Sequence, residues 1–337
     1  MKLYIAHAGI HLGSTAATQN SLRSIALAQA AGFDFCELDI WLTSDGVPVA
    51  VHNPTLNATY CTANEYTVPD APVSVTEHTA AYLREHYIGR ASDPAHRKVI
   101  PLLSECLALA KSLGIVPMIH PKSYDDASVD VIMDVCDAVM GAHNYYIVAE
   151  NAACAHALQR DPMQPIMPVI TDIAGIDYWT SFPNVIIAIR RAQDYAELTA
   201  CTHQKNYPIE TTLNDDIRAS LTADVINYDY LSPGRFERYE NITDYRLPAQ
   251  TMKAGDTLQL TDNRTVSYGT AEISFTFCGD GVLEVCGRRF QLKADVPTAY
   301  RAPVLVSERI ADAMLCAASD AEVSEIHMRV GEHPVRL

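Results

Sequence analysis

Over the first 230 residues, short apolar runs alternate regularly with longer stretches of helical periodicity. Eight runs have the length of a buried strand: Leu3–His7, Phe35–Ile40, Val47–His52, Ile115–Ile119, Tyr145–Val148, Ile166–Ile170, Val185–Ile189 and Pro208–Thr212. Helical periodicity separates most of them, as in Ser21–Ala31, Leu102–Leu113, Ser128–Met140 and Ala192–Cys201. Strands that alternate with helices form parallel sheets. The sequence therefore predicts an α/β fold, a (β/α)8 TIM barrel.

Two interruptions make the predicted barrel irregular at its second and third strands. Only the tight turn Thr43–Gly46 joins these two strands, where a helix is expected. The segment 53–99 is then polar and interrupted by proline, with one helical patch at Glu77–Glu85. Because an excursion of this length in a barrel is usually functional, we expect it to lie over the C-terminal mouth.

The periodicity changes near Ser232–Gly234, after which apolar and polar residues alternate. The alternating segments are Thr257–Leu260, Ala271–Phe277, Val282–Cys286, Arg289–Leu292, Val304–Val306 and Glu325–Val330. Alternation with a period of two is typical of strands that bury one face. We therefore predict two domains, a barrel over residues 1–232 and an antiparallel, sandwich-like β domain over residues 235–337.

Charge and cysteine content narrow the possible partners and the compartment. The chain has 41 acidic and 25 basic side chains, a formal net charge of −16, which disfavours nucleic acid and anionic lipid. Any phosphate site therefore needs a local cation. Nine cysteines without a CxxC pair indicate a reducing compartment such as the cytoplasm, although a removed secretory signal would leave the same pattern. No apolar run is long enough for stable membrane insertion, and the oligomeric state stays open.

Polar side chains gather where the predicted barrel strands end, which is where barrel enzymes place their reactive groups. Glu37 and Asp39 are two positions apart, so a strand places both on one face. Two acids in an apolar strand need a cationic partner, either a hard divalent metal ion or a basic residue such as Lys122. His7 and His52 end two other predicted strands and can supply an acid and a base of near-neutral pKa.

Several motifs resemble those of the glycerophosphodiester phosphodiesterase family over about the first 230 residues. The stretch from Glu37 to Leu56, which reads ELDIWLTSDGVPVAVHNPTL, resembles the central signature of that family without a gap. Shorter motifs match the opening, middle and closing parts: Ile5–Gly9, Gln19–Ser21, Ile100–Glu105, Thr212–Asp215 and Asn227–Asp229. The resemblance implies a metal-dependent phosphodiesterase, a hydrolase that acts on a small glycerophosphodiester of lipid metabolism.

The same resemblance implies roles for individual residues. It places one divalent metal ion, Mg²⁺ or Ca²⁺, on Glu37 and Asp39, and the acid–base roles on His7 and His52. It places Lys122 on the phosphate. The sequence leaves open which histidine is the base.

The chain departs from the family pattern at two positions that matter for this site. Ala8 stands where the family has a phosphate-binding arginine, and His120 stands where it has the third acidic ligand. A histidine ligand would shift the preference of the site toward Zn²⁺ or another transition metal. Glu150 and Glu210, which end two other predicted strands, are alternative acids, and Arg190 is a candidate to replace the missing arginine.

The sequence thus predicts hydrolysis of a small phosphodiester to an alcohol and a phosphomonoester by histidine acid–base catalysis. The alternative is a barrel without catalysis that binds a phosphorylated or glycosylated ligand, with the β domain as a carbohydrate-binding or assembly module. The two acids and both histidines favour catalysis, whereas the missing third acid favours the alternative.

Overall fold

The structure is a computed structural model of the 337-residue chain. It describes residues 3–11, 17–56, 59–90, 98–189, 195–205, 207–212, 223–228, 237–260, 265–266, 269–285, 288–306, 309–310 and 313–336.

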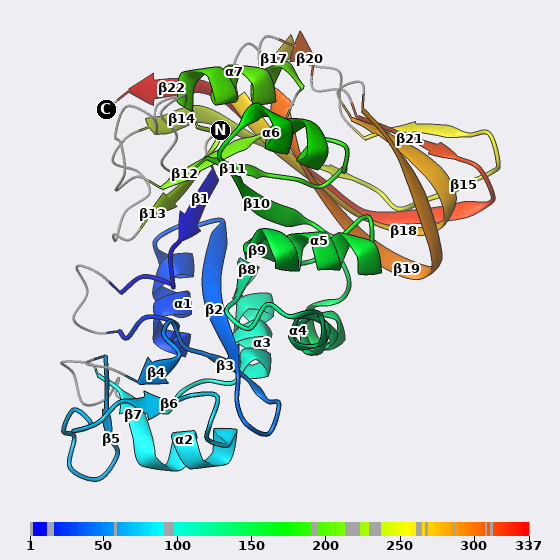
Figure 1. Cartoon of the computed structure of the whole chain (residues 1–337). Helices are drawn as coiled ribbons and strands as arrows, with labels where there is room; N and C mark the ends of the chain where they lie inside the picture. Colours follow the sequence, from blue (N-terminus) through cyan, green and yellow to red (C-terminus); the bar gives the residue numbers. More distant parts are fainter. Residues whose placement is uncertain are drawn as a thin grey trace.

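Eight of the described strands run parallel and close into a barrel (Figure 1). In order around the barrel they are β1 (Leu3–Ala6), β2 (Phe35–Leu42), β8 (Val116–Pro121), β9 (Tyr146–Ala149), β10 (Ile166–Ile170), β11 (Ile187–Ile189), β12 (Ile209–Thr212) and β13 (Val225–Tyr228). Closure comes from β13, which pairs with β1 so that Leu3 faces Val225. The predicted TIM barrel is confirmed.

One predicted barrel strand is wrong. The run Val47–His52 forms β3 (Pro48–Ala50), which turns back and pairs antiparallel with β2 instead of joining the barrel. The eighth barrel strand is β13, which was not among the predicted strands. A short apolar run looks the same in a barrel strand and in a hairpin strand, so periodicity alone could not separate them. The turn at Gly46, with φ of +73°, was the signal for a hairpin.

The helices that cover the barrel are α1 (Leu22–Ala30), α3 (Leu103–Leu113), α4 (Asp126–Met140), α5 (Asn151–Arg160), α6 (Ile173–Trp179) and α7 (Tyr195–Gln204). Local signals set their ends: Ser21 and Ser24 form a capping box on α1, and Gly114 ends α3 with φ of +71°. Alternate strand residues face opposite ways, so one core fills the barrel and another lies between strands and helices. Among the described residues, no helix is both long and apolar enough to cross a membrane.

The excursion after β3 folds into its own small unit beside β2. It contains β4 (Thr55–Leu56), β5 (Tyr60–Thr62), β6 (Val73–Ser74), α2 (Ala80–His86) and β7 (Tyr87–Gly89). Its apolar side chains pack on Val49 and Val51, and Arg84 of α2 makes two hydrogen bonds of 2.7 and 2.9 Å to Glu105 of α3. In Figure 1 the unit lies toward the end of the barrel to which β1 points. That it covers the mouth stays a prediction.

The rest of the chain forms antiparallel strands, as predicted. They are β14 (Glu237–Leu247), β15 (Gln250–Met252), β16 (Thr257–Gln259), β17 (Thr265–Val266), β18 (Gly269–Val285), β19 (Arg288–Val306), β20 (Arg309–Ile310), β21 (Ala313–Ala317) and β22 (Ala321–Arg336). All but β17 and β20, which pair with each other, belong to one sheet with its own core around Phe275 and Phe277. The predicted junction at 232–234 lies outside the described residues, so the domain division stays a prediction.

The sheet meets the barrel at the N-terminal ends of β9 and β10, which we call the floor. His143, just before β9, contacts the backbone of Ala299 in β19, and Met163, just before β10, packs on the core of the sheet. In Figure 1 the sheet and the excursion accordingly lie at opposite ends of the barrel. The carboxyl ends of the barrel strands, which we call the mouth, are therefore remote from the sheet.

Candidate active site

Two acids of β2 lie at the mouth on the interior side of the barrel. Glu37 and Asp39 are 1% and 0% exposed, and Leu38 between them belongs to the outer core. Phe35 belongs to the interior core, so the alternation along β2 carries both acids inward. Two carboxylates buried side by side are costly unless cations compensate them.

His120 of β8 supplies part of this compensation. Its Nδ1 lies 3.1 Å from Glu37 Oε1 and 3.3 Å from Asp39 Oδ1. Register explains the contact, because Asp39 faces His120 directly across the β2–β8 pair. Lys122, two residues further along the chain, places its Nζ 3.0 Å from Asp39 Oδ1.

The three groups fit a single metal ion. One ligand atom each from Glu37, Asp39 and His120 lies within 4.8 Å of the others, and no other such group occurs among the residues that the structure describes. Asp39 Oδ1 is buried, yet no donor in the described chain meets it with hydrogen-bond geometry. A buried carboxylate oxygen beside charged groups but without a hydrogen bond suits a cation as its partner. Two carboxylates and one imidazole are an appropriate donor set for a divalent ion.

The pKa values of the three groups reflect the same charge cluster. Burial raises the pKa of Glu37, but His7 and His120 outweigh it and bring the pKa to about 2. Burial also raises the pKa of Asp39, but the close contact with His120 and the charge of Lys122 lower it well below the usual value. For His120, burial lowers the pKa, but Asp39 and Glu37 raise it to about 9. Without a metal ion, both acids are therefore ionised and His120 is cationic at neutral pH.

Two buried asparagines hold the acids in place, and sequence analysis assigned them no role. Asn20 Nδ2 donates to Asp39 Oδ2 at 2.8 Å, and its Oδ1 accepts from the Asp39 backbone N–H at 2.9 Å. Asn20 adopts φ of +56°, a conformation that asparagine tolerates better than most residues. Asn227 of β13 donates from Nδ2 to Glu37 Oε2 at 3.3 Å. Both lie in motifs that carry the family resemblance, which was the available signal.

The two histidines predicted for acid–base chemistry flank this cluster. His7 follows β1, is 35% exposed in its side chain, and places Nε2 3.7 Å from Glu37 Oε2. His52 follows β3, and the preceding Val51 donates its backbone N–H to the carbonyl of Asp39 at 3.0 Å. The antiparallel return of β3, and not the end of a barrel strand, therefore brings His52 to the level of Asp39.

The remaining predicted residues have different outcomes. Glu150, at the end of β9, joins the site because its Oε1 lies 3.4 Å from His120 Nε2. Glu210 is fully buried on β12 and is absent from the metal-ligating group found among the described residues. Arg190 lies outside the described residues.

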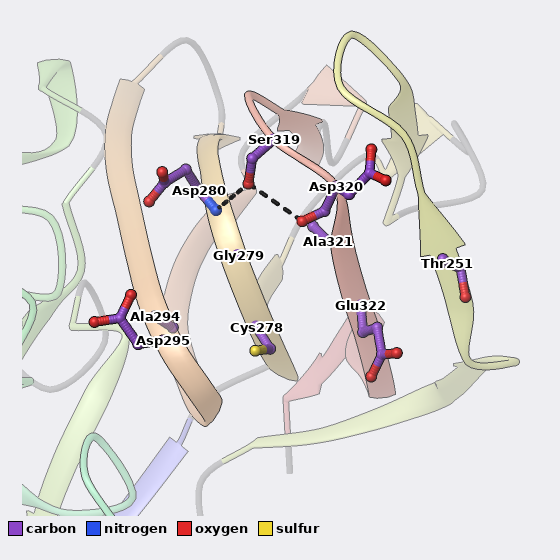
Figure 2. A pocket seen from close by; sticks show the side chains of 10 residues that line it. All are labelled: Thr251, Cys278, Gly279, Asp280, Ala294, Asp295, Ser319, Asp320, Ala321 and Glu322. Atoms are coloured by element: carbon purple, nitrogen blue, oxygen red, sulfur yellow. Dashed lines mark hydrogen bonds between the residues drawn. The ribbon is translucent and has the colours of Figure 1, made fainter.

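A separate cavity of about 590 Å³ lies in the C-terminal sheet (Figure 2). Its lining includes Asp280, Asp295, Asp320 and Glu322, and Ser319 accepts a hydrogen bond of 2.9 Å from the backbone N–H of Asp280. Lys253 pairs with Asp320 at 2.7 Å. This cavity is therefore acidic but open and partly neutralised, unlike the buried cluster at the mouth.

Comparisons with known proteins agree with the site at the mouth. Residues 11–148 match the model of the glycerophosphoryl diester phosphodiesterase family. No curated protein matches the chain.

Solved structures share the fold at low sequence identity. A phosphodiesterase from Oleispira antarctica, in complex with the product sn-glycerol-3-phosphate, has a TM-score of 0.54 and 18% identity over 68% of this chain and 93% of its own. A glycerophosphodiester phosphodiesterase from Agrobacterium tumefaciens has a TM-score of 0.52 and 17% identity over 69% of this chain and 97% of its own. One from Parabacteroides distasonis has a TM-score of 0.53 and 18% identity over 68% and 83%.

The family match covers the strands that carry Glu37, Asp39, His52 and His120. Within the barrel, residues 11–148 therefore match the glycerophosphoryl diester phosphodiesterase family, and the barrel shares the fold of solved phosphodiesterases.

Proposed function

We propose that the chain hydrolyses a small glycerophosphodiester-like substrate to an alcohol and a phosphomonoester at the mouth of the barrel. The observation that carries the proposal is the buried cluster of Glu37, Asp39 and His120, with Lys122 beside it and His7 Nε2 3.7 Å from Glu37. Such a cluster concentrates charge where a phosphate with its own negative charge has to be neutralised.

Glu37, Asp39 and His120 would hold one divalent cation. When bound, the ion would neutralise charge on the phosphate oxygens, which is the electrostatic help that phosphoryl chemistry needs most. The imidazole favours a transition metal such as Zn²⁺, whereas two carboxylates alone would favour Mg²⁺ or Ca²⁺. We infer that the site accepts both kinds of ion and prefers the former.

The other residues divide the remaining chemistry. Lys122 Nζ, 3.0 Å from Asp39, donates to a non-bridging phosphate oxygen while the acid holds it in place. One of His7 and His52 removes a proton from the attacking hydroxyl, which belongs to the substrate or to water. The other gives a proton to the leaving alkoxide. His7 follows β1 and His52 follows β3, and both of these strands pair with β2, which carries the two acids.

The product in the Oleispira structure supports glycerol phosphate as part of the substrate. Ala8 replaces the arginine of the family pattern, so this chain has one cation fewer for the phosphate. We infer that it depends more strongly on Lys122 and on the bound ion.

The test begins with metal analysis of the purified protein. Hydrolysis of glycerophosphocholine and of bis(p-nitrophenyl) phosphate is then measured with and without a chelator. We expect activity that the chelator removes and that added Zn²⁺ or Mg²⁺ restores. Glu37→Gln should bind metal more weakly and lose turnover, whereas Glu197→Gln on the exposed face of α7 removes the same charge and should change neither. Metal binding without hydrolysis of either substrate would support the non-catalytic alternative.

A further inference from the structure

We propose that Glu150 is a positioning residue that holds the Nε2–H of His120, so that Nδ1 is the nitrogen presented to the metal. The inference rests on the metal site of the proposed function. In this inference Glu150 binds His120 and does not bind the ion. It also explains how a neutral imidazole can act as a ligand at a position where the family has an acid.

The contacts of the ring are divided between its two nitrogens. Nδ1 faces the two buried acids, Glu37 and Asp39, at 3.1 and 3.3 Å. Nε2 faces Glu150 Oε1 at 3.4 Å. The acids at Nδ1 are 2% and 1% exposed in their side chains, whereas Glu150 is 41% exposed. The ring therefore stands between a buried anionic pair and a carboxylate at the solvent rim.

The position of Glu150 follows from the barrel. Glu150 comes directly after β9, the neighbour of β8, and Ile119 faces Ile147 in that pair. From there its carboxylate contacts the His120 ring at Nε2, the nitrogen that does not face Glu37 and Asp39. An ion between Nδ1, Glu37 and Asp39 would have the imidazole between itself and Glu150, and Glu150 is not part of the ligand group. Glu150 is therefore in the wrong place for a ligand and in the right place for a partner of the ligand.

Hydrogen-bond chemistry then sets the tautomer. An ionised carboxylate only accepts hydrogen bonds, so Glu150 requires a hydrogen on Nε2. A neutral imidazole with its hydrogen on Nε2 has its lone pair on Nδ1, directed at the site where the ion would bind. Without Glu150, the opposite tautomer can donate from Nδ1 to Glu37, and that tautomer has its lone pair on Nε2, away from the two acids. Carboxylate support of this kind commonly changes metal affinity by about 10- to 100-fold.

Lys122 is compatible with this arrangement. Its Nζ lies 3.1 Å from Nδ1 and 3.3 Å from Nε2 of His120, and 3.0 Å from Asp39. An ammonium group only donates, so it competes for the Nδ1 lone pair and cannot replace Glu150 as the acceptor for Nε2–H. Whether the ring carries one hydrogen or two, the one on Nε2 stays with Glu150.

The experiment compares metal binding by the full-length wild type, Glu150→Ala and Glu150→Gln, with Glu197→Gln as the charge-matched control. Calorimetry measures the Kd for Co²⁺, and the visible spectrum of bound Co²⁺ reports the nitrogen ligand. We expect Glu150→Ala to weaken Co²⁺ binding by about 10-fold or more. Glu150→Gln should recover most of the affinity, because its amide oxygen still accepts from Nε2–H.

A second comparison separates positioning from direct ligation. In a His120→Ala background, Glu150→Ala should cause no further loss, because no ring remains to be oriented. If the two losses are additive, or if Glu150→Gln is as weak as Glu150→Ala, Glu150 is a ligand and the inference is wrong. A wild type that binds no divalent ion also overturns it. If the wild type binds Co²⁺ as expected but hydrolyses no phosphodiester, the proposed function fails while the role of Glu150 stands.

Discussion

The mouth and the floor of the barrel each hold a buried histidine. The two histidines differ in whether the number of their polar partners equals the number of their ring nitrogens. On the floor, His143 is 3% exposed and has one acceptor for each nitrogen: Ala299 O lies 3.0 Å from Nδ1 and Asp161 Oδ2 lies 2.6 Å from Nε2. Its ring also lies against Tyr300, with the ring centroids 4.8 Å apart. All of these groups belong to the seam between barrel and sheet.

At the mouth, His120 has more anions around it than it has hydrogens. The ring is 8% exposed. Three carboxylates, those of Glu37, Asp39 and Glu150, and the ammonium group of Lys122 each lie within 3.4 Å of one of its nitrogens. The floor histidine has its full set of partners, so nothing remains for a ligand to satisfy. The mouth histidine has more carboxylates around it than it can donate hydrogen bonds to, and a metal ion can compensate the remaining negative charge. A buried histidine thus indicates structure when its partners match it in number and a binding site when they exceed it.

The largest difference between the two regions should appear in turnover. His7→Ala and His52→Ala should each lower kcat by on the order of 10²-fold or more, since a positioned proton carrier is lost. The fold should survive because neither residue is in the core. Steady-state kinetics with glycerophosphocholine measures the effect, and circular dichroism checks the fold. Near-normal turnover in either variant would remove that histidine from the mechanism.

A change in metal preference is the next largest effect expected at the mouth. His120→Glu restores a third carboxylate, so the affinity for Mg²⁺ or Ca²⁺ should rise by roughly 10-fold relative to Co²⁺, because hard cations prefer oxygen ligands. Titration of both proteins with each ion measures the shift. An unchanged Mg²⁺ affinity would show that His120 is not a ligand.

On the floor, the expected effect is on stability. His143→Ala removes a buried ring and its contacts with Asp161 Oδ2 and the Ala299 carbonyl, which should cost about 2–4 kcal/mol of unfolding free energy. Urea unfolding gives the loss, while kcat and metal affinity should not change. His156→Ala serves as the control, since its partners Asp126 and Asp130 lie at the surface. A loss of turnover in folded His143→Ala would contradict the separation of the two regions.

A smaller effect should depend on pH. Burial raises the pKa of Asp161, but the hydrogen bond with His143 outweighs it and lowers the pKa below its ordinary value. The stabilisation is therefore present above the unfolded pKa of about 3.9 and is lost as pH falls through the lower folded pKa. Because Asp161 is partly exposed, Asp161→Asn should cost no more than ~1 kcal/mol at pH 7 and progressively less below pH ~4. Unfolding curves at pH 7 and pH 3 test this, and an equal cost at both would exclude the ionised carboxylate as the cause.

The smallest effect on catalysis should come from removing the sheet. We propose that residues 1–232 and 235–337 are separate domains, since their cores are distinct and their seam is at the floor. A barrel ending near residue 232 should keep kcat/KM but lose solubility, because the floor is uncovered. Metal binding by calorimetry verifies that the site persists. A soluble, metal-bound barrel without turnover would give the sheet a part in catalysis.

Sequence patterns were enough to predict the barrel, the antiparallel sheet and the acids that gather at the mouth, because these follow from periodicity and strand ends. They could not place β3, since an apolar strand of three to six residues fits a hairpin and a barrel equally well. They missed the bonds of Asn20 and Asn227, since these contacts join segments that are separated in the sequence by 19 and 190 residues. They also left Glu150 open between ligand and lining residue, and only the ring geometry of His120 separates the two.

The β2–β3 hairpin also has a consequence for how the protein folds. It carries Glu37, Asp39 and, just beyond its last pair, His52, and its pairs, such as Ile40 with Ala50, join residues close in sequence. Hairpins form in about 1–10 μs, whereas pairing Leu3 with Val225 has to close a loop across most of the barrel. His7 follows β1, which pairs with β2 through Ile5 and Phe35, whereas the barrel closes only when β1 also pairs with β13. During refolding, the backbone around the two acids should become native before activity appears. The delay should equal the time that the last pair of barrel strands needs to form.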